Sequence, residues 1–562
     1  MAGTTGRSMV VFTSAGKRVL FYGGGGVSSA DMEGRLSTLT GMATAVMGLA
    51  QQEPFRERIR CARFSGSNVC LVVLQRHELV FVATGRGCEA YLARELEYFH
   101  EAVVMALTTR VHKLLATSPG YDVGELLGST GSVMESIAKK AETSGEWLCG
   151  AVKAVRLDPL ARANVGHVLL SARKIAKQLG GNVVFAFLFC GDKLVQCLCP
   201  PSTQERSLRA TDVLLLSNFV SSQRQSLVAA ESSWLPICLP RFESRGYLHA
   251  YVSYVDESID LSLVLVAADD ASGTVGAFRD VSNSVKDALD RDGVLSALRD
   301  VTKVDATAFA ANRIAAETNG CEHFLFSRRR ALKHSSFATL AGGAGLGANP
   351  AQTNNNSPAA ATRPQNGLSS PSNDKGDKGN PTEDTSSPSH QSNNNRRRSL
   401  GRSTSKLLAE GPDVFPPAKP EDAIAQCLAT DVVVSNEDHD NKDLKKKDQT
   451  TRQRVPDRTW LAYRGLALRL RSNTTQPHAT LPSSLDASAH DIFETTLANA
   501  LLYEVDGPTT YVSLTGPNFE LFATFLTFAP ITKLAEETRR LLAKLYREEA
   551  HFFFDPIFVN AY

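Results

Sequence analysis

The chain has no apolar run long enough to cross a bilayer, which takes about 20 consecutive apolar residues. It also lacks an N-terminal apolar segment followed by a small-residue cleavage site. An excess of charge of one sign is missing as well, because 61 basic residues are balanced by 59 acidic ones. We therefore expect a cytoplasmic protein that meets membranes only peripherally and has no nucleic-acid partner.

Motifs of covalent catalysis are absent too, since neither Gly-x-Ser-x-Gly nor His-Glu-x-x-His occurs. Residues 14–17 end like a phosphate-binding loop, but Arg18 follows in place of Ser or Thr and a strand continues. A hairpin turn is the better interpretation. The glycine run at 23–26 lacks the spacing of a dinucleotide site. We expect no covalent catalysis and no cofactor.

The ten cysteines form no regular framework. The closest group is Cys190, Cys197 and Cys199, which lie in two expected strands. No second Cys or His pair follows at the short spacing of a zinc site. Free core thiols in a reducing compartment are the favoured interpretation, and a metal site is the weaker one.

One internal segment, residues 342–456, differs from the rest in composition because it is rich in Asn, Ser, Pro, Gly and Lys. It has too few apolar side chains to offset the entropy of ordering, which predicts a mostly disordered insert. Ser399 and Ser403 follow arginines in "RRRSLGRS" and are phosphorylation candidates for basic-directed kinases.

The remaining residues repeat one arrangement: two strands, a helix, three strands and a helix. The first copy has expected strands at 10–13, 19–22, 59–64, 69–74 and 79–84, and helices at 36–50 and from 91. The second has strands at 183–189, 193–199, 235–239, 248–255 and 261–267, and helices at 211–220 and from 275. The third is interrupted by the insert and has strands at 323–327, 501–505, 510–514 and 521–527, and helices from 460 and from 531.

This order predicts an α+β fold of three domains, each with an antiparallel five-stranded sheet and flanking helices. The expected domains span 1–145, 146–305 and 306–562.

The helix expected at 36–50 has an unusual composition, because no residue from Leu36 to Gln52 is charged. One apolar stripe consists of Leu39, Ala43, Val46 and Ala50, and the opposite stripe consists of Gly41, Ala45 and Gly48. A helix that is apolar all round is buried all round. Two helix glycines cost about 1 kcal/mol each relative to Ala. The helix is therefore either internal to a larger core or, as we favour, covered by another protein.

Trp234 begins a strand that contains Pro236, with Pro240 directly after it. Since proline lacks the N–H that a central strand needs, we expect an edge strand. Trp234 either packs against a helix of its own domain or is a docking anchor for another protein. A basic cluster directly follows the strand at 323–327 and is either ordinary solvated charge or a membrane-facing patch. It consists of Arg328, Arg329, Arg330 and Lys333.

Several long segments of the chain have a distinctive sequence. In the first domain these segments are "VVFTSAGKRVLFYG", "CLVVLQRHELVFVAT", "LARELEYFHEAVVMALT" and "YDVGELLGST". In the second they are "GAVKAVRL", "VVFAFLFCGDKLVQCLCP", "TDVLLLSNFVSS" and "WLPICLPRFESRGYLHAYVSYVDESIDLSLVLVAAD". Near the end is "FELFATFLTFAPITKLAEETRRLLAKLYREEAHFFFDPIF". These segments resemble the Mon-one family of vacuolar fusion proteins, and the repeated order resembles three longin domains in series. The chain departs from the family in its larger insert and in having no long extension before the first strand.

The resemblance implies one subunit of a two-chain guanine nucleotide exchange factor. The other subunit would be a Ccz-one type longin protein, bound through the first longin domain of each chain, with Gly41, Thr44, Ala45 and Gly48 at the partner and GTPase interface. The pair would activate a Rab-seven type GTPase for endosome maturation and vacuole or lysosome fusion. It would act on anionic membranes bearing phosphatidylinositol 3-phosphate, after an upstream Rab-five type GTPase docks at Trp234.

Two other interpretations remain open. One is a longin-type trafficking scaffold or adaptor without exchange activity. The other is a different tri-longin exchange subunit, including the Ccz-one partner itself.

Overall fold

The computed structural model describes sixteen stretches of the chain, all within one compact unit. They are residues 7–23, 29–51, 61–63, 69–86, 89–128, 130–200, 208–230, 232–268, 275–303, 306–329, 424–429, 457–472, 500–516, 519–526, 530–554 and 556–558. Among the described helices, none combines the length and apolarity needed to cross a bilayer.

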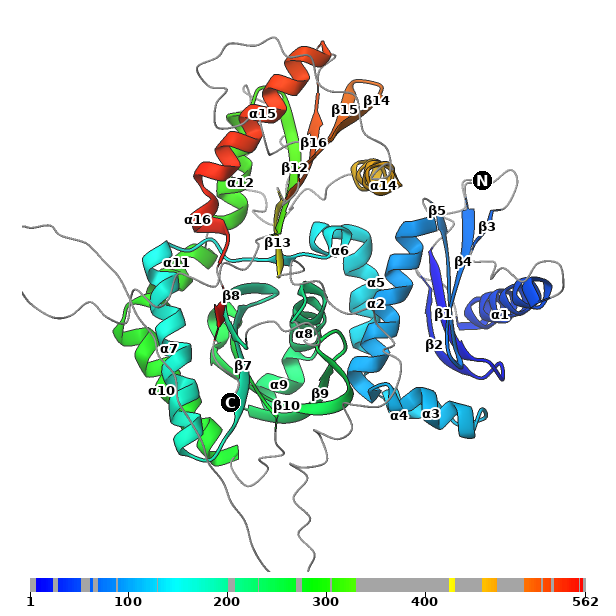
Figure 1. Ribbon diagram of the computed structural model, residues 1–562, viewed down its shortest axis with the longest axis horizontal. Coiled ribbons are helices and arrows are strands. Elements are labelled where there is room, and N and C mark those ends of the chain that lie inside the picture. Colours follow the sequence, from blue (N-terminus) through cyan, green and yellow to red (C-terminus); the bar gives the residue numbers. More distant parts are fainter. Residues whose placement is uncertain are drawn as a thin grey trace, which may run out of the picture. The chain divides into compact units, whose positions relative to one another are not determined.

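Three antiparallel sheets form the framework of this unit (Figure 1). The first contains β1 (Ser8–Thr13), β2 (Arg18–Gly23), β3 (Cys61–Arg63), β4 (Val69–Arg76) and β5 (Leu79–Arg86). The second contains β7 (Val183–Cys190), β8 (Lys193–Cys199), β9 (Ser232–Leu239), β10 (Glu243–Asp256) and β11 (Leu261–Ala267). The third contains β12 (Cys321–Arg329), β13 (Ala425–Ala429), β14 (Ala500–Asp506), β15 (Thr509–Gly516) and β16 (Phe519–Phe525).

The three sheets share one topology. Their strand orders are β2-β1-β5-β4-β3, β8-β7-β11-β10-β9 and β13-β12-β16-β15-β14. Numbered within each domain, every sheet therefore reads 2-1-5-4-3. In the first two sheets, strands one and two form a hairpin whose tight turn places glycine at positive φ, with Gly16 at 81° and Gly191 at 60°. The predicted α+β fold with three equivalent five-stranded sheets is confirmed.

Alternate residues of a strand point to opposite sides of the sheet, so each sheet presents side chains on two faces. Helices cover both faces of each sheet. One helix follows the second strand: α1 (Ser29–Gln51), α8 (Ala210–Ser222) and α14 (Asp457–Ser472). The other follows the fifth strand: α2 (Glu89–Leu107), α10 (Val275–Arg291) and α15 (Ile531–Arg547). In the first domain Val10 and Phe12 face α1 while Met9 and Val11 face α2. Figure 1 shows α1 and α2 on opposite faces of that sheet.

Several further helices had no counterpart among the expected elements. Those between the first and second sheets are α3 (Arg110–Thr117), α4 (Val123–Leu127), α5 (Thr130–Thr143), α6 (Gly145–Cys149) and α7 (Pro159–Gln178). The others are α9 (Arg224–Ala229), α11 (Val294–Lys303), α12 (Ala306–Ala316) and α16 (Glu549–Phe552).

The largest hydrophobic core joins all three domains. It contains Phe99 of α2, Leu216 of α8 and Tyr463 of α14, together with buried residues of α5 and α6. The first domain therefore contributes the helix after its fifth strand to this shared core. The second and third domains contribute the helix after their second strand instead.

The structure corrects one predicted boundary. The strand β13 lies inside residues 342–456, which were expected to be mostly disordered, and it pairs with β12 over five residues. Ile424, Cys427 and Leu428 are buried there. This run is short but apolar, so it buries enough surface to complete the third sheet. Residues 330–423 and 430–456 lie outside the described part of the chain.

Two very short strands each pair with the sheet of another domain. The strand β6 (Val152–Lys153) pairs in parallel with β13 of the third sheet. The strand β17 (Ile557–Phe558) pairs in parallel with β8 of the second sheet. Both extend a sheet at its second strand. Contiguous domain boundaries at 145 and 305 therefore do not describe how these two segments pack.

Candidate protein-interaction site

The inner face of α1 forms an ordinary helix-to-sheet core. Leu39 and Ala43 are buried, and they pack with Val10, Phe12 and other residues from one face of the first sheet. The predicted apolar stripe is confirmed for these two residues. The side chains of Val46 and Ala50 lie outside the described part of the chain.

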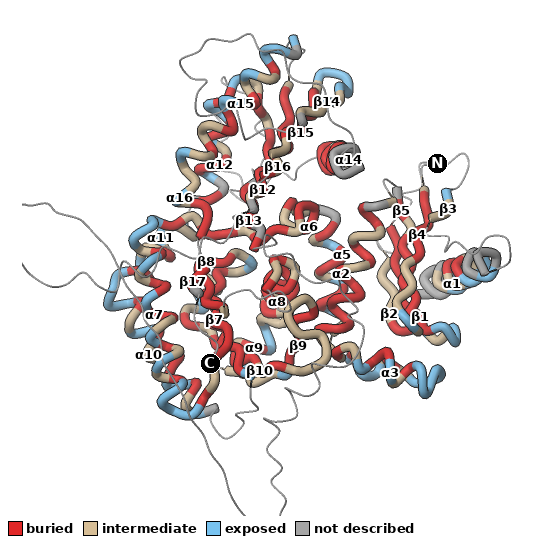
Figure 2. The backbone as a smooth tube through the Cα atoms, in the orientation of Figure 1, coloured by how far each residue is buried: buried red, intermediate tan, exposed pale blue. Residues whose placement is uncertain are grey.

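The outer face of α1 is open. Gly41, Thr44, Ala45 and Gly48 are all exposed, and Figure 2 shows exposed stretches along α1. A Cβ atom added at Gly41 or Gly48 would meet nothing within 4 Å, so no packing among the described residues requires glycine at either position. Within the described residues, α1 is therefore not an internal helix. These four residues form an uncharged surface of small side chains that is exposed to solvent. That this surface is a protein interface stays a prediction.

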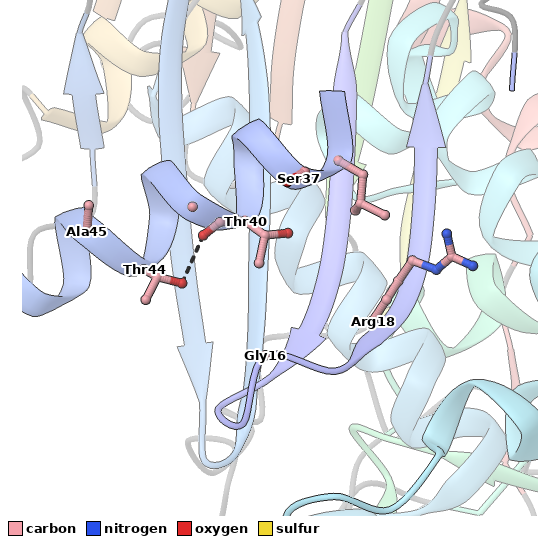
Figure 3. A pocket seen from close by; sticks show the side chains of 8 residues that line it. Gly16, Arg18, Ser37, Thr40, Thr44 and Ala45 are labelled. Atoms are coloured by element: carbon pink, nitrogen blue, oxygen red, sulfur yellow. Dashed lines mark hydrogen bonds between the residues drawn. The ribbon is translucent and has the colours of Figure 1, made fainter. Parts of the chain in front are cut away.

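A hollow of about 690 Å³ adjoins this face, between α1 and the turn that connects β1 to β2 (Figure 3). Its lining consists of Gly16, Arg18, Leu36, Ser37, Thr40, Gly41, Thr44 and Ala45. Three of the four predicted interface residues therefore line one cavity, and Gly48 lies one turn further along the helix. The Thr44 hydroxyl donates a hydrogen bond to the Thr40 carbonyl oxygen at 2.8 Å.

The β1–β2 turn is held in place from its other side. The Lys17 ammonium pairs with the Asp122 carboxylate at 3.0 Å and lies 3.4 Å from the Gly120 carbonyl oxygen. The hydrogen bond from Lys17 lowers the pKa of Asp122 below its ordinary value. Because Lys17 is engaged with the α3–α4 connection, the resemblance of residues 14–17 to a phosphate-binding loop does not extend to their geometry. The hairpin-turn prediction is confirmed.

The helix α8 occupies the same topological position as α1 but is covered on all sides. Its side chains carry one charge, at Asp212, and residues from Ala210 to Val220 are mostly buried. The helix α5 lies against its outer face: the Asn218 amide nitrogen donates to the Val133 carbonyl oxygen at 3.1 Å. The Ser136 hydroxyl donates to the Asn218 amide oxygen at 2.7 Å.

The helix α14 is covered in the same way. The Arg464 guanidinium carbon lies 4.0 Å from the centre of the Tyr91 ring of α2. The Tyr463 hydroxyl is fully buried and lies 2.9 Å from both His323 Nδ1 and the Thr524 hydroxyl. Burial raises the pKa of Tyr463 well above its ordinary value. Of the three equivalent helices, α1 is the one whose outer face has no cover from described residues.

Sequence patterns gave no sign of the polar contacts that join the first two domains. The Arg241 guanidinium, after β9, pairs with the buried Glu101 carboxylate of α2. Burial raises the pKa of Glu101, while Arg241 opposes that shift. The Thr109 amide donates to the Ser244 carbonyl oxygen at 2.9 Å. Periodicity marks a residue as facing inward but does not say which distant residue meets it.

A histidine pair lies beside this junction and was also not predicted. His100 Nε2 and His112 Nε2 are 3.3 Å apart, and the His77 ring packs on His112 with centroids 4.5 Å apart. Burial, then His77 and Arg76, lower the pKa of His112 to about 4. Burial, then His112, Arg76, Arg241 and His77, lower the pKa of His100 well below its ordinary value. Both rings are therefore neutral at pH 7.

Trp234 lies on β9, an edge strand of the second sheet, as predicted from the prolines. Its ring is stacked with His249 at 5.6 Å and contacts Phe278 of α10 at 5.2 Å between centroids. It is half-buried, and its buried Nε1 has no hydrogen-bond partner in the described part of the chain. These contacts match the interpretation in which Trp234 packs on a helix of its own domain. Its role as a docking anchor stays a prediction.

The predicted basic patch needs one correction. Arg328 ends up half-buried on β12, where its guanidinium pairs with Glu549 and lies 4.9 Å from the centre of the Tyr546 ring. It is therefore engaged within the third domain and is not free surface charge. The side chain of Arg329 lies outside the described residues, as do Arg330, Lys333, Ser399 and Ser403. Cys190, Cys197 and Cys199 are buried free thiols.

Comparison with known families agrees with the repeated sheets. A model described as the first longin domain of FUZ, MON1 and HPS1 matches residues 7–137. A model described as the second longin domain of FUZ, MON1 and HPS1 matches residues 181–276. These ranges contain the first sheet, with α1 and α2, and most of the second.

Individual relatives come from animals, fungi and plants. Vacuolar fusion protein MON1 homolog A of Gallus gallus is 30% identical over 264 residues, which is 47% of this chain and 44% of the relative. Vacuolar fusion protein MON1 of Cryptococcus neoformans is 24% identical over 326 residues, 58% of this chain and 48% of the relative. A MON1 homolog of Oryza sativa is 30% identical over 230 residues, 39% of this chain and 37% of the relative. The matches span less than half the length of these relatives.

Proposed function

Because this chain carries the first and second longin domains of the FUZ, MON1 and HPS1 family and is similar to MON1 proteins of three kingdoms, we propose that it is one subunit of a two-chain guanine nucleotide exchange factor. The proposed substrate is a Rab-seven type GTPase of late endosomes and vacuoles. The observation that carries the proposal is the uncovered, uncharged outer face of α1 in the first longin domain.

The first step of the proposal is assembly with a second longin chain of the Ccz-one type. An exposed helix face made of Gly, Ala, Ser and Thr contributes little to the stability of the chain alone. Small residues instead allow another backbone to approach closely. The equivalent faces of α8 and α14 are covered by helices of neighbouring longin domains. A longin domain of another chain is therefore a fitting cover for α1.

The second step is nucleotide release, which needs no acid, base or cofactor. An exchange factor binds the nucleotide-free GTPase more tightly than the loaded one, so by linkage it weakens nucleotide binding. Accelerating release about 10,000-fold takes about 5.5 kcal/mol. Disturbing the Mg²⁺ site or the phosphate-holding Lys of the GTPase is of that order.

Recruitment is the third step. We propose an upstream Rab-five type GTPase at Trp234 and an anionic membrane bearing phosphatidylinositol 3-phosphate. The Trp234 ring is half-buried on the edge strand β9, so part of it is accessible to another protein. Trp234→Ala removes that ring surface. It should lower binding to vesicles carrying the upstream Rab while sparing exchange in solution; unchanged vesicle binding would contradict the docking role.

A nucleotide-release assay on a small panel of Rab GTPases tests the whole proposal. The chain with its Ccz-one type partner should accelerate release from a Rab-seven type GTPase and from few others. A pair that assembles but accelerates release from no panel member would instead favour a trafficking scaffold or adaptor. Gly41→Leu should abolish assembly, whereas Gly276→Leu is the matched control. Gly276 is also exposed on a helix, α10, with nothing within 4 Å of an added Cβ.

A further inference from the structure

One charged side chain stands at the margin of the uncharged α1 face. Arg18, the first residue of β2, lines the hollow and is the single charged residue in its lining (Figure 3). It is exposed, and no side chain in the described part of the chain pairs with it. The neighbouring Lys17 differs, since it pairs with Asp122 at 3.0 Å.

Arginines elsewhere in the covered parts of the first domain have acceptors. Arg7 pairs with Glu95 of α2, and Arg76 pairs with Glu97 on the same helix. Arg94 donates to the Leu148 carbonyl oxygen at 2.6 Å. Arg18 has no such acceptor among the described residues, and it lies beside the face that we propose is covered in the assembled complex.

Covering α1 would also remove water from the hollow, because Gly41, Thr44 and Ala45 belong to both surfaces. A guanidinium that loses water without gaining an acceptor is costly, and the cost is offset when a carboxylate binds it through paired hydrogen bonds. The hollow also has the other features of a carboxylate-binding site. It has hydroxyls from Ser37 and Thr40, no acidic side chain in its lining, and room left by Gly16 and Gly41.

We propose that the hollow receives an acidic side chain, Asp or Glu, from the chain that covers α1, and that its carboxylate binds the Arg18 guanidinium. This inference rests on the proposed function, because it requires that another longin chain cover α1. Beyond the proposed function, it assigns a chemistry to the contact: a carboxylate of the partner chain bound to the Arg18 guanidinium. The contact would set the register of the two chains, since the small-residue face alone contains no charged group.

Affinity for the partner chain tests the proposal. Arg18→Glu should weaken binding about 30-fold or more, because it sets two carboxylates against each other in a poorly hydrated site. Arg18→Lys should lose much less, since it keeps the charge but not the fork of donors. Arg279→Glu is the control, an exposed arginine of α10 in the second domain, and should leave affinity unchanged. Circular dichroism and thermal melting of each variant alone establish that folding is intact.

Charge exchange identifies the other half of the contact. Each acidic residue of the partner's first longin domain is changed to Lys, and each variant is tested against Arg18→Glu. One of them should restore most of the lost affinity. If Arg18→Glu binds like Arg279→Glu while Gly41→Leu fails to bind, the carboxylate contact is overturned and the proposed function stands. If weakening occurs but no partner variant restores it, the contact is likewise overturned. If Gly41→Leu also binds normally, the proposed interface fails as well.

Discussion

The helices α1 and α8 follow the second strand of two sheets with the same topology, but they have opposite surroundings. The helix α1 has no charged residue after Arg35, and α8 has one, Asp212. Yet α8 is buried against α5 of the preceding domain, whereas the outer face of α1 is exposed. An uncharged helix therefore signals a covered face without identifying the cover. For α8 the cover is part of the same chain, and for α1 we propose that it is another chain.

The difference arises from which helix each domain contributes to the shared core. The first domain contributes α2, so its other helix, α1, is left on the outside. The second and third domains contribute α8 and α14. Their outer helices are α10 and α15, which have charged, exposed faces such as Lys286 and Arg540. The described outer faces of α10 and α15 are thus charged, whereas α1 has no charged residue from Leu36 onward.

The largest expected loss of stability comes from breaking the contact that keeps α2 in the shared core. Arg241→Ala leaves the Glu101 carboxylate, which is 1% exposed, without its partner. Removing one member of a buried pair costs about 3–5 kcal/mol of unfolding free energy. Urea denaturation measures this loss, and Arg279→Ala should stay within about 0.5 kcal/mol of the parent chain. A loss below about 1 kcal/mol would mean that the junction contributes little to holding the domains together.

The next effect compares α8 with α1 directly. Asn218→Leu removes the hydrogen bonds to Val133 and Ser136 and enlarges a buried side chain. We expect a loss of about 2–3 kcal/mol, because the Val133 carbonyl and the Ser136 hydroxyl lose their partners in a dry site. The same urea measurement applies. Wild-type stability of this variant would show that the cover of α8 is loose.

Acid should weaken the junction through His100 and His112. Their pKa values are lowered in the folded protein, to about 4 for His112, against 6.5 for a free histidine. Both rings are neutral above pH 6.5 in folded and unfolded chains, so stability is complete there. Below pH 6.5 the unfolded chain binds protons first. Stability therefore falls by up to about 1.4 kcal/mol per pH unit for each ring until the folded pKa is reached.

The control for this pH dependence is a change that removes one titration. His112→Gln should flatten the fall in unfolding free energy between pH 6.5 and pH 5, whereas His167→Gln, an exposed residue of α7, should leave it unchanged. Equal slopes in all three proteins would contradict a role for the buried pair.

The smallest expected effect on stability is that of Gly41→Leu in the chain alone. The new side chain enters open space, and leucine is the better helix former, so unfolding free energy should change by less than about 1 kcal/mol. A loss of several kcal/mol would show that this face of α1 is needed for folding. The contrast with Asn218→Leu would then disappear.

Much of this architecture could be predicted from the sequence, because hairpins and helices are determined by residues close together in the chain. The hairpin at 183–199 shows apolar runs broken by Gly191, and the closing helix α15 has a clear period of 3.6. The strands β6 and β17 could not be predicted, because a strand of two residues shows no alternation of apolar and polar residues. Each is a strand only because it pairs with the edge of a sheet from another domain. The strand β13 was hidden by the polar segments around it.

The candidate site was predictable only in part. The absence of charge between Leu36 and Gln52 marked α1 as a covered helix and identified Gly41, Thr44, Ala45 and Gly48. The same reasoning would have selected α8, which is covered within the chain. That Lys17 is paired and Arg18 is not depends on Asp122, a residue more than 100 positions away. Sequence spacing contains no information on such a contact.

The most direct test of the central claim is the accessibility of the outer face of α1 with and without the partner. Thr44→Cys places a thiol on that face, and Gly276→Cys places one on α10 as a control. Alkylation at each introduced site is followed by peptide mass spectrometry. In the presence of a Ccz-one type subunit, we expect labelling at position 44 to slow at least about tenfold while labelling at 276 is unchanged. Equal labelling at 44 in a complex that forms normally would contradict the claim that another chain covers α1.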